Sequence, residues 1–76
     1  MQISKALALS KTQLAEVGIS SSSLDATILL AFILNSNKEF VIFNGEKELN
    51  SEQEISFFNL IDKRKKFEPI SHLIQK

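Results

Sequence analysis

One histidine is the first side chain to consider for acid–base or metal chemistry. His72 is the only histidine of the chain, and the chain has no cysteine. General-base catalysis and metal binding both need partner groups that converge on one point. The sequence neighbours of His72 are Ser71 and Leu73, which supply neither a base nor a second ligand. We therefore interpret His72 as a surface or partly packed imidazole.

Four carboxylates gather in a short stretch of the second half, at Glu46, Glu48, Glu52 and Glu54. A calcium-binding EF-hand loop requires Asp or Asn at alternate positions, a central glycine and a glutamate at its twelfth position. The sequence does not contain that pattern, so we interpret these carboxylates as a solvated loop followed by the start of a helix. We predict no catalytic residue and no metal ligand in this chain.

The glycines argue against a nucleotide or cofactor site. Gly18 and Gly45, the two glycines of the chain, lie far apart in the sequence. A phosphate-binding loop needs several glycines close together, between a strand and a helix. We therefore predict no cofactor-binding residue in this chain.

A run of four cations is the remaining candidate, at Lys63, Arg64, Lys65 and Lys66. One interpretation is a contact surface for phosphates or for an acidic partner. The other is a solvated helix end whose positive charge complements the negative end of the helix dipole. The run lacks the interleaved aromatic residues of a nucleic-acid surface, which favours the second interpretation. These four residues are nevertheless our candidate partner contacts.

Length and composition restrict the chain to one small domain. A chain of 76 residues hides only about 60% of the surface that its unfolded form exposes. Its apolar residues, 43% of the sequence, are therefore needed for a core and leave little for a deep pocket. Nine basic and nine acidic residues give no net charge, which is unusual for a nucleic-acid binder.

Two further features bear on the expected compartment. The longest apolar run, residues 28–34, is far shorter than the ~20 residues of a membrane span. A chain without cysteine is compatible with a reducing environment. We expect a cytoplasmic protein with no direct nucleic-acid or membrane partner.

Hydrophobic periodicity predicts helices in the first half of the chain. A first helix is expected from about residue 2 to residue 17, closed by Gly18 in the left-handed conformation with Ile19 folding back. A second is expected from about residue 23 to residue 34, capped by one of the serines 21–23. This most apolar segment should form the centre of the core. The side chains expected to face inward are Leu24, Ile28, Leu29, Phe32 and Ile33.

The second half is less uniform. Residues 38–44 allow a short helix ended by Gly45 or the first strand of a hairpin, and we favour the helix because the returning strand would be highly charged. The last long helix, residues 51–66, has a strong start signal, since Asn50 with Gln53, or Ser51 with Glu54, approximates a capping box. Its expected inward residues are Ile55, Phe58 and Ile61, with Phe57 and Leu60 as further candidates.

Pro69 restricts the residue before it to extended conformations, so the last long helix should end by Phe67. We expect Phe67 to be partly exposed and residues 70–76 to form a tail or one short turn. The sequence thus predicts an all-α fold, a small bundle of four to five short helices.

Several short motifs resemble a known family in their order and spacing. They are Gly18-Ile19, then Leu24-Asp25-Ala26 with Ile-Leu-Leu-Ala at 28–31, then Leu49-Asn50 with Gln53, then Arg64 with Glu68-Pro69-Ile70 and His72-Leu73. Together they resemble the N-terminal domain of the HemK/PrmC family, the release-factor glutamine methyltransferases. Phe67 and Gln75 depart from the pattern, because the family commonly has glycine at both positions.

The resemblance implies that residues 1–76 are the N-terminal helical, substrate-docking domain of a longer methyltransferase. In that family a Rossmann-like catalytic domain follows, binds S-adenosylmethionine and carries an Asn-Pro-Pro-Tyr motif. Neither feature is in this sequence, so this fragment is not expected to be catalytic. The full enzyme methylates the glutamine of the Gly-Gly-Gln motif in peptide chain release factors. The implied partners are a release factor and the protein's own catalytic domain.

Two other classes of function stay open. The first alternative is a free-standing helical interaction module or a small homodimeric adaptor. A methyltransferase reading frame that continues after Lys76 would exclude this alternative. A small enzyme is disfavoured, because the sequence offers no nucleophile–base pair and no metal cluster.

Overall fold

The computed structural model describes residues 1–74, so Gln75 and Lys76, including the family departure at Gln75, lie outside the described residues. Five helices follow one another: α1 (Ile3–Glu16), α2 (Ser22–Ile33), α3 (Lys38–Phe43), α4 (Ser51–Lys65) and α5 (Ile70–Leu73). Within the described part the extended pairing is a single antiparallel bridge between Gln2 and Glu48. This arrangement confirms the predicted all-α bundle of four to five short helices.

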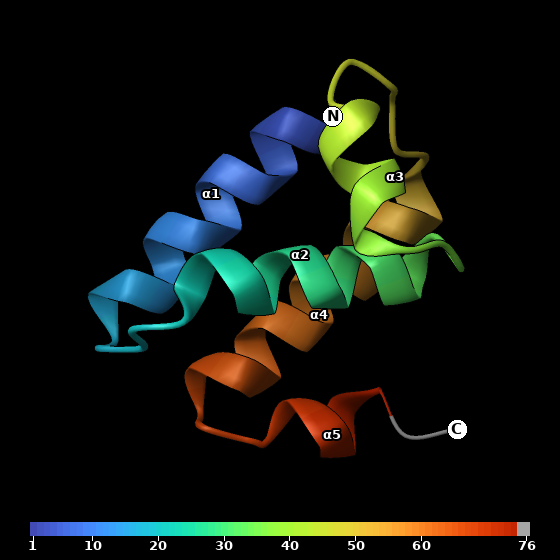
Figure 1. The fold of residues 1–76 in the computed structure, drawn as a ribbon. Coiled ribbons are helices and arrows are strands. Elements are labelled where there is room, and N and C mark those ends of the chain that lie inside the picture. The colour runs from blue at the N-terminus through green and yellow to red at the C-terminus, as the bar shows by residue number, and fades with distance from the viewer. Residues whose placement is uncertain (75–76) are drawn as a thin grey trace.

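Helix α2 lies at the centre of the bundle and packs against α1, α3, α4 and α5 (Figure 1). Leu29 and Leu30 are fully buried, and Ala26 and Ala31 are almost so. A helix with neighbours on several sides buries apolar residues around most of its circumference. The prediction that this segment forms the centre of the core is therefore confirmed.

The first turn of α2 buries a different residue from the one that was predicted. Leu24 was expected to point inward, but it is 50% exposed, whereas Asp25 is 5% exposed. Asp25 forms an ion pair with Arg64 of α4, and this pair occupies the inward position. The expectation for Leu24 was wrong because an ion pair, rather than an apolar side chain, fills the space between the two helices. The other expected residues are buried or half-buried: Ile28, Leu29, Phe32 and Ile33.

Helix α4 is also rotated relative to the prediction. Phe57 and Ile61 are fully buried, while Ile55, which was expected to face inward, is 63% exposed. Phe58 is half-buried, and its ring lies edge-on to Phe57 with 5.1 Å between the ring centroids. The buried positions 57 and 61 and the half-buried position 64 follow the i, i+4, i+7 spacing of one helix face, and α4 packs against α2.

The start of α4 has the predicted capping box. The backbone N–H of Gln53 donates to Oδ1 of Asn50 at 2.8 Å, and the backbone N–H of Asn50 donates to Oε1 of Gln53 at 2.9 Å. Each bond satisfies a backbone donor that has no partner inside the helix. Of the two registers that the sequence allowed, the one at Asn50 is therefore confirmed.

The N-terminal residues pair with the loop between α3 and α4. The backbone N–H of Ser4 donates to the carbonyl of Gly45 at 2.9 Å, and that of Leu49 donates to the carbonyl of Met1 at 2.8 Å. A Cβ atom at Gly45 would lie 3.2 Å from the Cβ of Ser4. Gly45 follows the helical segment α3, which confirms the helix over the hairpin. It does not have the positive φ expected of a helix-ending glycine; instead it allows close approach to α1.

The amino group of Met1 lies between two carboxylates of this region. It is 3.2 Å from Oε2 of Glu54 and 3.3 Å from Oε1 of Glu48. The hydrogen bond with Glu54 is the largest influence, and with the attraction of both carboxylates it raises the pKa of the amino group above its ordinary value of 8.0. The amino group therefore holds its proton more tightly in the folded chain than in the unfolded chain.

Three helices end in the same backbone motif. After α1, α2 and α4 the chain passes through one residue of positive φ, and the next N–H donates to a carbonyl five residues earlier. The residues of positive φ are Gly18 (88°), Asn35 (54°) and Phe67 (68°). The closing bonds run from Ile19 to Leu14 at 3.1 Å, from Ser36 to Ala31 at 2.9 Å and from Glu68 to Lys63 at 3.4 Å.

The first of these ends confirms the predicted role of Gly18, and Ile19, 6% exposed, folds back as expected. Phe67 is different, because a side chain in the left-handed region costs about 1–2 kcal/mol while glycine has no such penalty. The turn that the resembling family builds on glycine is thus formed here on phenylalanine. The ring of Phe67 is 61% exposed, as predicted.

We expect Phe67→Gly to unfold with a free energy about 1 kcal/mol higher than Phe67→Ala. Both changes remove the ring, and only glycine adopts the positive φ without strain. Urea unfolding followed by circular dichroism measures the difference. As a control, Ala8→Gly in the exposed face of α1 should destabilise by a similar amount, because φ is negative there. Equal stabilities for the two Phe67 variants would contradict the assignment of strain.

We also expect the stability of the chain to fall as pH rises above about 8, because folding raises the pKa of the amino group. A group whose pKa is raised by folding stabilises the fold while it is protonated, and this contribution is lost as pH rises through the folded pKa. Glu54→Gln should flatten this part of the profile. Glu52→Gln, in the same first turn of α4 but without a contact to the amino group, should leave it unchanged. An identical slope for wild type and Glu54→Gln in urea unfolding would refute this origin.

Candidate functional site

The basic run occupies the C-terminal end of α4. Lys63, Arg64 and Lys65 lie in its last turn and Lys66 is the C-cap residue, while Glu52 and Glu54 lie in the first turn. Both ends of the helix therefore carry the charge that complements the helix dipole.

Arg64 differs from the three lysines of the run, because its side chain turns inward and is only 18% exposed. Its Nε donates to Oδ2 of Asp25 at 3.0 Å, and its Nη1 donates to the backbone carbonyl of Glu68 at 2.9 Å. One guanidinium thus joins α4 both to α2 and to the turn that leads into α5. The planar, forked geometry of arginine suits such a double contact, whereas lysine has a single charged atom.

Asp25 is held from three directions. It accepts hydrogen bonds from Arg64 and from the hydroxyl of Ser21, the latter at 2.9 Å, and it lies in the first turn of α2, where the dipole favours negative charge. Ser21 is the N-cap residue, as expected, but its side chain does not bond to a backbone N–H. The expected serine cap is wrong in that respect, because the hydroxyl of Ser21 donates its hydrogen bond to Oδ2 of Asp25 instead.

This network is fully satisfied. Within residues 1–74 no buried side-chain nitrogen or oxygen lacks a hydrogen-bond partner. Both bonds to Asp25 end on Oδ2, and the charged one, from the guanidinium, is the stronger kind. Asp25 and Arg64 therefore serve the structure rather than acid–base chemistry.

The three lysines of the run face solvent to different degrees. Lys63 and Lys66 are exposed and Lys65 is half-buried. The ion pairs found within residues 1–74 involve Met1, Arg64 and His72, and none of the three lysines. Their positive charge is thus available at the surface around the end of α4.

The other candidates from the sequence, His72 and the four glutamates, do not form a common site. His72 is 64% exposed, and its Nδ1 is 3.4 Å from Oε1 of Glu68. Glu48 and Glu54 face the amino group of Met1, and Glu46 and Glu52 are exposed. In the described part of the chain no three His, Asp or Glu side chains gather closely enough to hold a metal ion.

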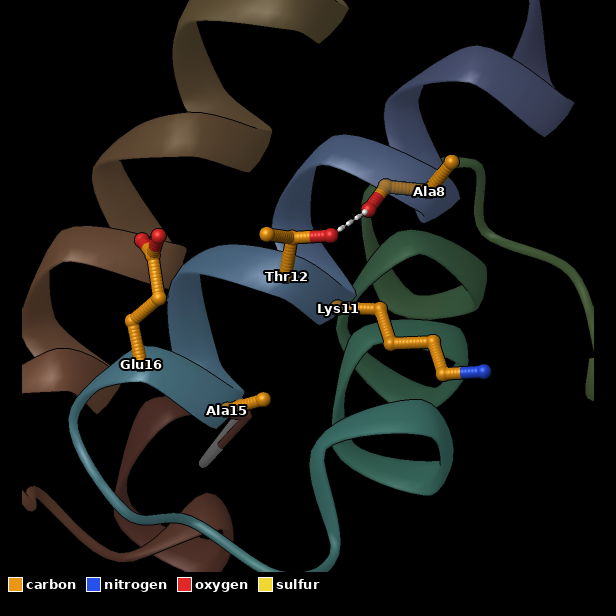
Figure 2. A pocket seen from close by; sticks show the side chains of 5 residues that line it. All are labelled: Ala8, Lys11, Thr12, Ala15 and Glu16. Carbon is orange, nitrogen blue, oxygen red and sulfur yellow. Dashed lines mark hydrogen bonds between the residues drawn. The ribbon is translucent and has the colours of Figure 1, made fainter.

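A shallow hollow of about 550 Å³ runs along the exposed face of α1, lined by Ala8, Lys11, Thr12, Ala15 and Glu16. The hydroxyl of Thr12 donates to the carbonyl of Ala8 at 3.0 Å. Figure 2 shows the side chains of Lys11 and Glu16 pointing in different directions. The hollow therefore presents small side chains and no pair of groups placed for proton transfer.

None of the helices in residues 1–74 has the length and apolar character needed to cross a bilayer.

Comparison with known proteins gives consistent matches. The family described as the PrmC N-terminal domain matches residues 5–74. A bifunctional methyltransferase of Rickettsia felis is 36% identical over 72 residues, which are 95% of this chain and 14% of that protein. A release factor glutamine methyltransferase of Borreliella burgdorferi is 36% identical over 59 residues, 78% of this chain and 21% of that protein.

A release factor glutamine methyltransferase of Caulobacter vibrioides is 29% identical over 70 residues, 92% of this chain and 24% of that protein. The chain thus spans less than a quarter of the length of each of these three relatives. No solved structure gives a significant match.

The Asp25–Arg64 pair generates a prediction of non-additive stability effects. Arg64→Ala and Asp25→Ala should each destabilise the chain by about 3 kcal/mol, because each leaves a buried charge without its partner. Replacing both, as Asp25→Leu with Arg64→Met, should cost less than the sum of the single changes. Lys65→Ala, one residue away, should change stability by less than about 0.5 kcal/mol. Strictly additive effects in urea unfolding would argue against a coupled pair.

Proposed function

The chain belongs to the PrmC N-terminal domain family of release factor glutamine methyltransferases, and from this membership we propose that it is the substrate-docking domain of such an enzyme. The observation that carries the proposal is the family match from residue 5 to residue 74. The proposed substrate is a peptide chain release factor, whose glutamine is methylated. The proposed parent is cytoplasmic and takes the methyl group from S-adenosylmethionine, bound by a Rossmann-like catalytic domain that follows this one.

A docking domain contributes to catalysis through binding energy. Contacts remote from the reacting atoms hold a macromolecular substrate in place, so that its reactive amide spends more time near the methyl donor. The available cations at the end of α4, on Lys63, Lys65 and Lys66, support a docking surface for an acidic region of the release factor. Long-range attraction between unlike charges raises the association rate and orients the encounter.

One match favours a second candidate for the parent. The relative in Rickettsia felis is a bifunctional methyltransferase and matches 95% of this chain. The second candidate parent is therefore a protein with two methyltransferase activities. In either parent this domain docks the release factor. The length of the reading frame after Lys76 separates the two candidates.

The docking surface is tested by charge reversal. Lys63→Glu and Lys66→Glu should each weaken binding of this chain to a bacterial release factor about 3- to 10-fold at low salt, and the difference should shrink as salt is added. Lys5→Glu, which makes the same change of charge on the exposed side of α1, is the matched control and should bind as wild type does. Isothermal titration at several salt concentrations measures all three.

A second arm uses the whole enzyme. Removal of residues 1–76 should lower kcat/KM for a release factor, because the docking contribution is lost. An unchanged kcat/KM after this deletion would remove the proposal.

A further inference from the structure

Phe67 is placed unfavourably on two counts. Its backbone has a φ of 68°, a conformation that carries a penalty for every residue type except glycine. Its ring is 61% exposed, so only a minor part of its apolar surface is removed from water. At the same position of the other two helix ends the chain has Gly18 and Asn35, the two residue types that adopt positive φ most readily.

The backbone that carries Phe67 is held on both sides. The N–H of Phe67 donates to the carbonyl of Arg64 at 2.8 Å, and the guanidinium of Arg64 donates to the carbonyl of Glu68 at 2.9 Å. Pro69 follows and limits the conformations of Glu68. An aromatic ring on a fixed backbone loses little conformational freedom on binding, and this is the property of an interface anchor.

Phe67 differs from the other strongly exposed aromatic residue. Phe43 is 78% exposed, but it lies in the helical backbone of α3, and no cation adjoins it in the sequence. Phe67 directly follows Lys66 and stands one helical turn after Lys63, and both lysines are exposed. An exposed ring preceded in the chain by exposed cations fits an apolar pocket with an acidic rim.

The turn lies away from the end of the described chain. Figure 1 shows the C-terminal turn of α4 at one end of α5 and the last described residues at the other end. The turn that carries Phe67 and the last described residues therefore lie at opposite ends of α5.

We infer that Phe67 is the apolar anchor of the docking surface and inserts into a pocket of the release factor whose rim is acidic. Lys63 and Lys66 contact that rim. The inference rests on the proposed docking function and adds the residue that fixes the position of the partner. The strain at Phe67 is retained because the ring stabilises the complex, although it does not stabilise the free domain.

The test measures binding of the 76-residue chain to a bacterial release factor by isothermal titration. Phe67→Ala and Phe67→Gly should both weaken binding about 10-fold or more, as expected for a central aromatic anchor. Phe67→Tyr keeps the ring and should bind within about 2-fold of wild type. Because Phe67→Gly relieves the backbone strain, its weak binding cannot be attributed to a less stable fold.

Two matched controls separate the ring from its context. Phe43→Ala removes an exposed ring elsewhere, and Asn35→Gly relaxes a positive φ elsewhere; both should bind as wild type does. The salt dependence of binding should persist in Phe67→Ala and weaken in Lys63→Glu, because only the second change removes a charge.

The failures are distinguishable. If wild type binds the release factor and Phe67→Ala and Phe67→Gly bind equally well, the anchor is overturned while the docking function stands. If wild type does not bind, both are overturned. Sedimentation that shows a dimer of this chain lost in Phe67→Ala would assign the ring to a second copy and also overturn the inference.

Discussion

The ion pair between Asp25 and Arg64 is the interaction on which the arrangement of this domain depends. It joins the first turn of α2 to the last turn of α4, and the same guanidinium bonds the carbonyl of Glu68. The first turn of α2 is thereby joined to the last turn of α4, 39 positions away, and to the turn that follows α4. Such a pair gains stability from additional hydrogen bonds to its charged groups, and the hydroxyl of Ser21 and the carbonyl of Glu68 supply two of them.

Short helices need this kind of support. Isolated helices of fewer than about 12–15 residues are marginal in water, and α3 and α5 are only 6 and 4 residues long. Asn37 caps the start of α3, and both helices pack against α2. The recurrent ending of α1, α2 and α4 serves the same need, since it pairs carbonyls that a helix end leaves without partners.

The motif residues and the surface residues have separate roles. Asp25 and Arg64, which carry the family resemblance, are buried partners within the fold. Lys63, Lys66 and Phe67 differ, because they are exposed. The apolar interior of this small domain stabilises the fold. The exposed lysines and the ring of Phe67 are left for the proposed recognition. The proposed contribution of the domain to methylation is therefore the position of the substrate, with the chemistry supplied by another domain.

The sequence alone determined the helices and most of their ends. Periodicity, the capping box at Asn50 and the left-handed position at Gly18 are local features, because each depends on residues within a few positions of one another. The end of α4 before Pro69 and the exposure of Phe67 were predictable for the same reason. The order of short motifs was likewise sufficient to indicate the family.

Only the tertiary structure decided which faces are buried and which cation is internal. Leu24 and Ile55 were expected inside and are exposed, because the inward positions are taken by Asp25 in α2 and by Phe57 and Ile61 in α4. Each of the four residues of the basic run carries one positive charge, yet Arg64 alone is paired with Asp25, 39 positions away in the chain. Hydropathy cannot identify such a pair, since burial of a charge becomes favourable only when a distant partner satisfies it.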